Sequence, residues 1–428
     1  MDLVYLPYDV LVEILHRLPV KSLIRFRCVS KSWNSLITSP AFINSNLTRS
    51  HSDSNKLIVR YLDVTPHVER YKLIHEDDND NNVSSSSEQI QDLKLPLRGS
   101  RSYFQLVGSA NGLFCLYEGN RFILWNPCIR KFITLPNPSV TAEFSCYPAF
   151  GFDSRTNDYK VVRIAYRSFT GFEGAKPPLV EVYSVSEGSW RVTSGGDSYP
   201  PKITMSDWPQ QAASLNGAVY FVANDWGDAR NLIVLSFDLG DEVFRLISLP
   251  NGKFRLHADA RVFTSEFKGL LSLICYESWR YSYCIWVMKE YGIVDSWTKQ
   301  FNIDLNMEDW KVLGFWKNDH VLVQKIQSGG LMLFSYDHVT LQLKNLGFCK
   351  STGCSYADKY VENLVLVDKP NDVVSKEESE QEEEVQSVAC HICPRWCSVI
   401  VFSAKSALRQ KITTIRRRSE GCRRVMWQ

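Results

Sequence analysis

The sequence predicts an α+β multidomain protein in which a small module of three helices precedes an all-β, propeller-like domain. Helical spacing of apolar residues is confined to the part before residue 48, whereas short apolar runs bounded by turn residues repeat after residue 55. After residue 368 the composition changes again and charged runs appear. The predicted domains are therefore residues 1–48, residues 55–368 and a disordered charged tail over residues 369–428.

The first predicted helix lies between two prolines. Pro7 fits the first turn, where a helix tolerates proline, and Asp9 adds a favourable acidic charge there. Pro19 ends the helix, because a proline further along has no amide hydrogen to donate. The helical spacing then gives one apolar face, which consists of Leu11, Ile14, Leu15 and Leu18.

Two shorter helices are predicted over residues 22–27 and 30–38. Val29, Trp33 and Ile37 stand four residues apart, so they share one face of the last helix. A module of this size buries too little surface to be stable alone, and its apolar stripes need a cover. The cover is either a partner protein or the chain's own second domain, in which case the helices are a structural cap.

After residue 55 the chain repeats a unit of apolar strands with a period of roughly 50 residues, which is typical of a β-propeller. One blade cannot bury both of its faces alone, but blades packed around an axis can. About six units are predicted, the first over residues 57–97, with a closing strand over residues 360–367. An open array of β-sandwich strands is the alternative. The anchors of the repeat are Phe132, Trp190, Phe244, Trp297 and Leu343.

The order of residues in the helical module resembles an F-box, the short module that joins a protein to a Skp-type adaptor and a cullin. The resemblance depends on Leu6-Pro7, Leu18-Pro19, Phe26-Arg27-Cys28, Ser30-Lys31-Ser32-Trp33 and Pro40-Ala41-Phe42. It implies an adaptor-binding surface formed by Leu6, Pro7, Val10, Ile14, Leu15, Leu18, Pro19, Val20, Leu23, Val29 and Trp33.

The repeat is similar to the F-box-associated interaction domain of plant F-box proteins, which are often labelled F-box/kelch-repeat proteins. The similarity depends on the runs 111–136 and 151–162, and with the helical module it covers residues 3–368. Kelch blades usually carry a glycine pair at the end of a strand. Only Gly195-Gly196 and Gly329-Gly330 occur here, which puts the kelch label in doubt but not the propeller.

Variable loops at equivalent positions of successive blades emerge on one face of a propeller, and such loops usually carry recognition. The links between the two apolar strands of each unit are predicted at residues 118–121, 165–178, 224–231, 277–282 and 327–330. Aromatic residues and arginines dominate interface energetics, so these loops are the predicted client-binding face. Local packing between the loops is the alternative. The candidate residues are Phe169, Phe172, Trp226, Arg230, Trp279, Arg280 and Tyr281.

The composition argues against several classes of partner. A formal net charge of +2 gives no general attraction to nucleic acid or to an anionic membrane, and no apolar stretch approaches the roughly 20 residues of a membrane span. No secretory signal is evident, so we expect the protein in the cytoplasm, the nucleus or both. Buried free thiols explain the cysteines in apolar runs better than disulfides do; these are Cys28, Cys115, Cys128, Cys275 and Cys284.

No catalytic motif, cofactor or metal site is predicted. The chain lacks a glycine-rich phosphate loop, a His-Glu-x-x-His pair and a Gly-x-Ser-x-Gly elbow. The run from Cys390 to Cys397 holds zinc-ligand types, but the second pair of ligands is missing. The acidic run 376–384 and the arginine-rich end are interpreted as a disordered tail, with a nuclear import signal or a polyanion-binding patch as the alternative.

The resemblance implies a non-catalytic substrate-recognition subunit of a Skp–cullin–F-box ubiquitin ligase. Its helices would bind the adaptor and, through it, the cullin and RING subunits, while its propeller would bind a client protein of unknown identity. Holding the client beside the conjugating enzyme raises its effective concentration, which promotes ubiquitination and proteasomal degradation. Two alternatives stay open, an adaptor-binding scaffold that does not degrade its partner and a propeller enzyme.

Overall fold

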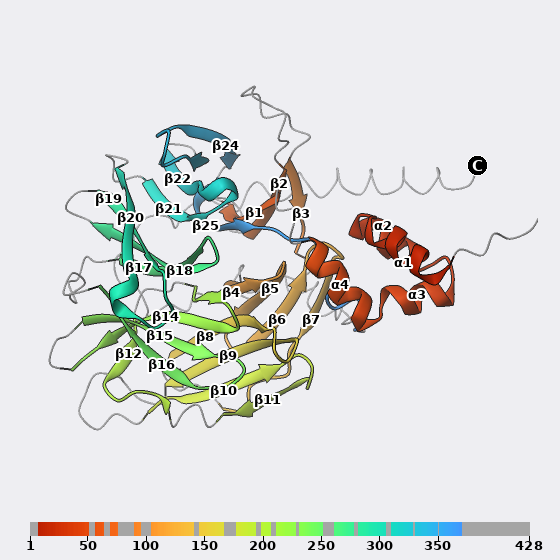
Figure 1. Cartoon of the computed structure of the whole chain (residues 1–428), viewed down its shortest axis with the longest axis horizontal. Coiled ribbons are helices and arrows are strands. Elements are labelled where there is room, and N and C mark those ends of the chain that lie inside the picture. The colour runs from red at the N-terminus through yellow and green to blue at the C-terminus, as the bar shows by residue number, and fades with distance from the viewer. Residues whose placement is uncertain are drawn as a thin grey trace, which may run out of the picture. The chain divides into compact units, whose positions relative to one another are not determined.

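The structure, a computed structural model, consists of four α-helices followed by six β-sheets (Figure 1). It describes residues 7–50, 56–63, 69–75, 90–95, 104–140, 145–166, 177–193, 198–206, 211–227, 231–250, 261–277, 281–304, 310–327, 330–349 and 351–369. The predicted tail beyond residue 369, the cysteine run 390–397 and the serine-rich insert 76–89 lie outside these residues. No helix in the described ranges is long and apolar enough to span a membrane.

The helical module contains the three predicted helices and one that was not predicted. Pro7 and Pro19 are the N-caps of the first two helices, and the Ser30 hydroxyl caps the third by accepting a hydrogen bond from the Trp33 amide at 3.1 Å. The fourth helix is rich in Asn, Ser and Thr, which conceals its apolar spacing. The helices are α1 (Tyr8–His16), α2 (Val20–Phe26), α3 (Lys31–Ile37) and α4 (Pro40–Ser50).

The six sheets are the blades of a β-propeller, which confirms the prediction over the β-sandwich alternative. Blade 2 consists of β4 (Gln105–Ala110), β5 (Leu113–Glu118), β6 (Arg121–Asn126) and β7 (Lys131–Thr134). Blade 3 consists of β8 (Ser145–Asp153), β9 (Asp158–Tyr166), β10 (Leu179–Ser184) and β11 (Ser189–Val192). Within each blade, neighbouring strands pair antiparallel in sequence order.

The next three blades follow the same plan, and blade 4 has a divided inner strand. It contains β12 (Ile203–Met205) and β13 (Ala213–Leu215), which both pair with β14 (Ala218–Asp225), then β15 (Asn231–Asp238) and β16 (Phe244–Ser248). Blade 5 contains β17 (Arg261–Phe267), β18 (Leu270–Glu277), β19 (Ser282–Met288) and β20 (Trp297–Asp304). Blade 6 contains β21 (Trp310–Phe315), β22 (Val321–Gln327), β23 (Gly330–Tyr336) and β24 (Leu343–Cys349). Short 3₁₀ turns, η3 (Val294–Ser296) and η4 (Lys317–Asp319), lie in blades 5 and 6.

Blade 1 is built from both ends of the propeller sequence. Its inner strand is β25 (Ser351–Lys359), which pairs with β1 (Lys56–Asp63); β2 (Glu69–His75) and β3 (Ile90–Leu93) complete the sheet. The prediction that residues 360–367 form the closing strand is therefore wrong, because β25 ends at Lys359 and the apolar run after it is not a strand. This pairing removes the free edge that an open ring would present.

Tight turns join the first two strands of several blades. Asn111 and Gly112 both have positive φ, at 52° and 78°, and Asn216 and Gly217 repeat this at 50° and 75°. Two successive residues with positive φ make the turn that matches the twist of a β-hairpin, and Asn-Gly is its preferred sequence. The Asn-Gly pairs that the repeat contains therefore fix the register of the strands beside them.

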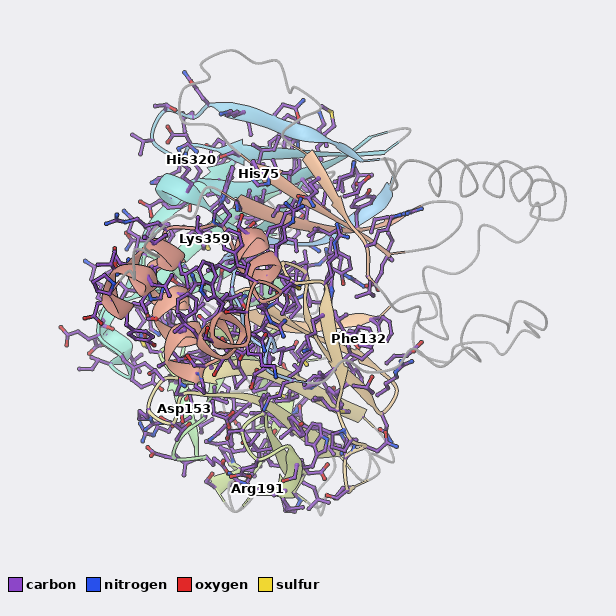
Figure 2. All side chains as sticks on the ribbon, turned by 90° about the vertical axis from the view of Figure 1, so that its right-hand side faces the viewer. His75, Phe132, Asp153, Arg191, His320 and Lys359 are labelled. Atoms are coloured by element: carbon purple, nitrogen blue, oxygen red, sulfur yellow. The ribbon has the colours of Figure 1, made fainter. Side chains whose placement is uncertain are left out.

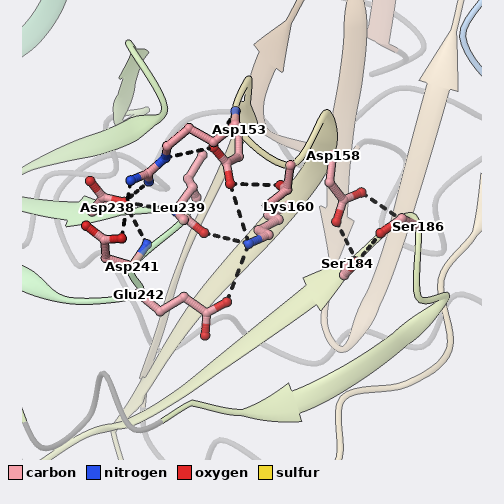
Figure 3. A network of polar contacts seen from close by, with 12 residues as sticks. Asp153, Asp158, Lys160, Ser184, Ser186, Asp238, Leu239, Asp241 and Glu242 are labelled. Atoms are coloured by element: carbon pink, nitrogen blue, oxygen red, sulfur yellow. Dashed lines mark hydrogen bonds and ion pairs between the residues drawn. The ribbon is translucent and has the colours of Figure 1, made fainter. Parts of the chain in front are cut away.

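Polar contacts join blades 3 and 4 at the end where these turns lie (Figure 3). Arg155, in the turn after β8, reaches Asp238 and lies 3.2 Å from Asp241. Asp238 is the last residue of the third strand of the next blade, and Asp241 lies in the turn after it. The buried Lys160 ammonium donates to the Leu239 carbonyl at 2.6 Å. A buried charge needs such partners, so these contacts bind one blade to the next beside the apolar core.

The described cysteines are free thiols, as predicted, but their burial differs. Cys115, Cys275 and Cys284 are buried, and burial raises the pKa of the Cys115 thiol well above its usual value. Cys128 is half-buried. The prediction of burial was wrong for Cys28, which is exposed in the turn after α2.

The helices pack on the propeller through one continuous apolar cluster. Side chains from all four helices share it with residues of blades 2 and 3 and with the segment 364–367 that follows β25. Figure 1 shows the helices beside the strands, and Figure 2 shows them in front of the propeller, with Lys359 of β25 placed between His320 of blade 6 and Asp153 of blade 3. The helical module is thus covered in part by the chain's own propeller.

Candidate functional site

An exposed apolar stripe runs along α1. Val10 and Ile14 are one turn apart on the same face of the helix, and 45% and 43% of their side chains are exposed. Tyr8, which was not among the predicted contact residues, is 65% exposed beside them, and Pro7 is exposed at the start of the helix. Because exposed apolar residues grouped on one helix mark a surface for a partner, we call Pro7, Tyr8, Val10 and Ile14 the α1 stripe.

Three of the predicted contact residues lie in the interior instead. Leu15, Val20 and Leu23 are 0%, 3% and 0% exposed and belong to the core cluster shared with the propeller. Their side chains therefore hold the module together and have no surface to offer a partner in this conformation. Their burial was not predicted from the sequence, and whether these three residues take part in adaptor binding stays a prediction.

The other predicted contact residues are distributed around the module. Val29 is 61% exposed and Pro19 is exposed, so both are accessible to a partner. Leu18 is half-buried against the core cluster, and Trp33 packs edge-to-face on Phe26 with ring centroids 5.5 Å apart. Leu6 lies outside the described residues. Whether these residues bind an adaptor stays a prediction.

Contacts between α1 and α4 hold the α1 stripe in place. The Arg49 guanidinium donates two hydrogen bonds to the Glu13 carboxylate, at 3.1 and 2.8 Å, and these lower the pKa of Glu13. The His16 ring stacks on Phe42 with centroids 4.4 Å apart, and Nε2 lies 3.1 Å from the Ser45 hydroxyl. Burial, with Arg49 as a second cause, lowers the pKa of His16. The ring is therefore held in its neutral form.

The segment 360–369, which follows β25, connects the module to blade 2. Asn363 is fully buried, and its amide donates to the Asn111 carbonyl at 2.8 Å. Asn126, also fully buried, donates to the Asn363 side chain at 2.7 Å and to the Val365 carbonyl at 2.9 Å. Sequence reasoning missed this role because an apolar run of eight residues is equally typical of a strand.

The predicted client-binding face is described only in part. Trp226 follows β14 and is 45% exposed, and its indole N–H donates to the Thr204 hydroxyl at 2.8 Å. Tyr281 precedes β19 and is 40% exposed. Both lie in the link between the second and third strands of neighbouring blades, so they emerge at the same end of the propeller. The remaining candidates lie outside the described residues: Phe169, Phe172, Arg230, Trp279 and Arg280.

The two ends of the propeller differ in what they contact. The segment 360–369 contacts blade 2 at Asn111, in the turn after the first strand, and at Asn126, the last residue of the third strand. The links that carry Trp226 and Tyr281 leave from the opposite ends of the strands, because the chain reverses at each turn. The candidate client face is thus at the end away from the module's attachment.

A central cavity of about 670 Å³ is lined by the inner strands of all six blades. Within it the Ser109 hydroxyl lies 2.7 Å from the Tyr356 hydroxyl, which donates to Asp358 at 2.8 Å. Burial raises the pKa of Asp358 above its usual value. The side chains of Ser109, Tyr356 and Asp358 therefore form hydrogen bonds with one another. Among the described residues no group of three or more His, Cys, Asp or Glu side chains is placed to hold a metal ion.

Comparison with known proteins gives the family. Residues 3–45 match the F-box domain, and residues 28–352 match the F-box associated beta propeller domain. An F-box/kelch-repeat protein of Arabidopsis thaliana is 27% identical over 381 residues, which are 86% of this chain and 96% of the relative. An F-box protein of the same plant is 29% identical over 309 residues, 69% of this chain and 74% of the relative.

Similarity to solved structures is weak. The lectin of Aleuria aurantia is 13% identical, with 72% of this chain and 93% of the lectin covered, at a TM-score of 0.36. That score is too low to support an inference about this protein. The two matched domains together span most of the chain, and the four helices and six blades agree with them. The chain therefore belongs to the family of F-box proteins that carry an F-box-associated β-propeller domain.

Proposed function

We propose that this protein is the substrate-recognition subunit of a Skp–cullin–F-box ubiquitin ligase. Its F-box binds a Skp-type adaptor, which brings the cullin and RING subunits, and its propeller binds a client protein. The subunit does no bond chemistry; it places the client beside a conjugating enzyme and so raises the rate of ubiquitin transfer. We propose that it works in the cytoplasm, the nucleus or both.

The observation that supports this proposal most directly is the α1 stripe within a matched F-box. The interior of the module is already covered by the propeller and the segment 360–369. Val10 and Ile14 nevertheless stay 45% and 43% exposed. A hydrophobic stripe that the fold leaves open favours a separate adaptor over the structural-cap alternative.

The adaptor step is tested by affinity purification from plant cells with the proteasome blocked. Val10→Asp and Ile14→Asp place a charge on the exposed stripe, where the change does not disturb the core. We expect either variant to lose the adaptor and cullin at least tenfold relative to the wild type, because a charge in an apolar interface must be desolvated. Proteins held by the propeller should remain bound.

A matched control is Val339→Asp. Val339 is also an exposed valine, at 77%, but it lies in the turn after β23 of blade 6. This variant should retain adaptor and cullin fully. If the wild-type chain captures no Skp-type adaptor, or if Ile14→Asp retains it, the proposed adaptor surface is wrong.

We propose that the client lies at the end of the propeller that carries Trp226 and Tyr281. Aromatic side chains exposed on loops supply large contact areas, which suits protein recognition. Trp226→Ala and Tyr281→Ala together are expected to reduce client capture at least tenfold while adaptor binding is unchanged. Undiminished capture by this variant would place the client elsewhere.

Degradation is tested separately from binding. Proteins captured by the wild type should become ubiquitinated in the presence of the adaptor and cullin, and should lose that modification in the Ile14→Asp variant. Depletion of this F-box protein should lengthen their half-lives. A captured protein whose half-life does not change would instead support the scaffold alternative.

A further inference from the structure

A second cavity lies where the F-box meets the propeller. Its volume is about 540 Å³, and three parts of the chain line it. Arg27, at the end of α2, and Asn34, in α3, come from the F-box, Lys131 begins β7 of blade 2, and Asp368 and Lys369 end the segment 360–369. The cavity thus lies on the junction that orients one domain on the other.

The cavity has an excess of positive charge. Three cationic side chains, Arg27, Lys131 and Lys369, meet one carboxylate, that of Asp368. Asp368 is 3.9 Å from the Lys369 ammonium, which is a loose ion pair. Among the described residues no ion pair joins Arg27 or Lys131 to a carboxylate, and the charge of Asp368 offsets only part of the repulsion that Lys131 experiences.

Hydrogen bonds hold Arg27 and Lys131 in place. The Arg27 Nε donates to the Asn34 side-chain oxygen at 2.9 Å, and the Lys131 ammonium donates to the Lys369 carbonyl. Both side chains are half-buried. Desolvation and the charge of Arg27 lower the pKa of Lys131, with Asp368 acting in the opposite direction. The two cationic side chains are therefore already positioned before a ligand binds. The terminal nitrogens of Arg27 have no described partner.

We propose that this cavity binds a small phosphate-bearing anion that bridges the F-box and the propeller. A phosphate dianion matches the excess of two positive charges, and its oxygens accept from a guanidinium and from ammonium groups that approach from different sides. A carboxylate carries one charge and two oxygens, so it satisfies the site less well.

The proposal is tested on the full-length chain by isothermal titration calorimetry with inorganic phosphate and with pyrophosphate. Potassium chloride at the same ionic strength is the reference, because it screens charge without bridging the donors. We expect saturable binding of both anions and an increase in the thermal unfolding midpoint that chloride does not produce.

Lys131→Gln and Arg27→Gln are each expected to weaken binding at least tenfold. The matched control is Lys289→Gln, which removes an exposed lysine at the end of β19, away from the cavity, and should leave binding unchanged. Unchanged circular dichroism spectra verify that the variants fold.

Three results would overturn the proposal. They are the absence of saturable binding, binding that neither cavity variant weakens, and binding only to anionic phospholipid vesicles and not to the free anions. The readout is binding by the isolated chain, so it is independent of the proposed ligase function.

Discussion

At the scale of single residues, two buried asparagines form a hydrogen-bond network that helps to attach the segment 360–369. Asn363 accepts from the Val365 amide at 2.9 Å while it pairs with Asn126, and Asn126 accepts from the Cys128 amide at 3.0 Å. A buried amide that loses its partner costs about 1–3 kcal/mol. The two residues are therefore coupled parts of one network.

Replacing Asn363 with alanine should lower the free energy of unfolding by about 2–4 kcal/mol, because several buried polar groups lose their partner at once. Chemical denaturation of the full-length chain measures it. Asn302→Ala is the control, since Asn302 is exposed in β20, and it should change stability by less than about 0.5 kcal/mol. Equal effects of the two substitutions would contradict the role of the network.

His16 makes the packing of α1 on α4 sensitive to pH. Its pKa in the folded protein is lowered from 6.5, so the unfolded chain binds the proton more readily. The contribution of His16 to stability is full above about pH 6.5 and falls as the pH drops toward the lowered pKa. A protonated Nδ1 would be a hydrogen-bond donor, and this atom is buried without a described acceptor. Glu13 and Arg49 are the charged groups nearby.

The expected result is a lower unfolding midpoint at pH 5.5 than at pH 7.5, with a smaller difference in His16→Gln than in the wild type. Differential scanning fluorimetry at both pH values measures it. Glutamine keeps a polar side chain but does not titrate. If both proteins respond to pH equally, His16 is not the group responsible.

Burial at single positions was the part of the F-box that the sequence could not predict. Helical spacing gives an apolar stripe, and it does not distinguish a stripe that faces the interior from one that faces a partner. Leu15 and Ile14 are adjacent, yet one is fully buried and the other is 43% exposed. Only the position of the propeller and of the segment 364–367 determines that Leu15 is buried and Ile14 is exposed.

At the scale of elements, the middle strands of the blades were predictable and the inner strands less so. β9 is buried along its whole length because blades pack on both of its faces, and its apolar run is visible in the sequence. β4 and β17 are less visible in the sequence, because strands that line the polar central cavity mix polar and apolar residues. The Asn-Gly turns can be recognised from the sequence, because the positive φ that they require is a local property.

Two turn glycines offer a matched comparison. Gly112 and Gly269 have φ values of 78° and 72°. A Cβ atom at Gly112 would lie 1.9 Å from the Val361 carbonyl, whereas one at Gly269 would meet nothing within 4 Å. Gly112 is thus needed for the close approach of the segment 360–369, and Gly269 only for its turn.

We expect Gly269→Ala to cost about 1–2 kcal/mol, the price of a side chain at positive φ. Gly112→Ala should cost at least about 2 kcal/mol more, because it also displaces the segment 360–369. Urea denaturation measures both. Similar losses in the two variants would mean that the segment adapts to the added methyl group.

At the scale of the whole molecule, the ring depends on one pairing between the two ends of the propeller sequence. β25 pairs with β1 along most of its length, and no other described strand covers that edge. An uncovered inner edge would present unpaired backbone groups and promote aggregation. The stability of all six blades therefore depends on the last strand.

Three truncated chains separate the roles of β25 and the segment after it. A chain that ends at residue 369 retains every described contact and is the reference for the other two. A chain that ends at residue 359 should keep a closed propeller but lose adaptor affinity, since the F-box is no longer supported. A chain that ends at residue 350 should aggregate on size-exclusion chromatography. A soluble, monomeric product from the last would contradict the need for closure.

The pairing of β25 with β1 also has a consequence for biosynthesis. β1 leaves the ribosome early and its partner strand leaves only after the other five blades, an interval on the order of tens of seconds at ordinary elongation rates. The buried side of the F-box waits equally long, because the segment 364–367 that covers it follows β25. We therefore expect both surfaces to stay exposed during translation, and a prematurely terminated chain to expose them permanently.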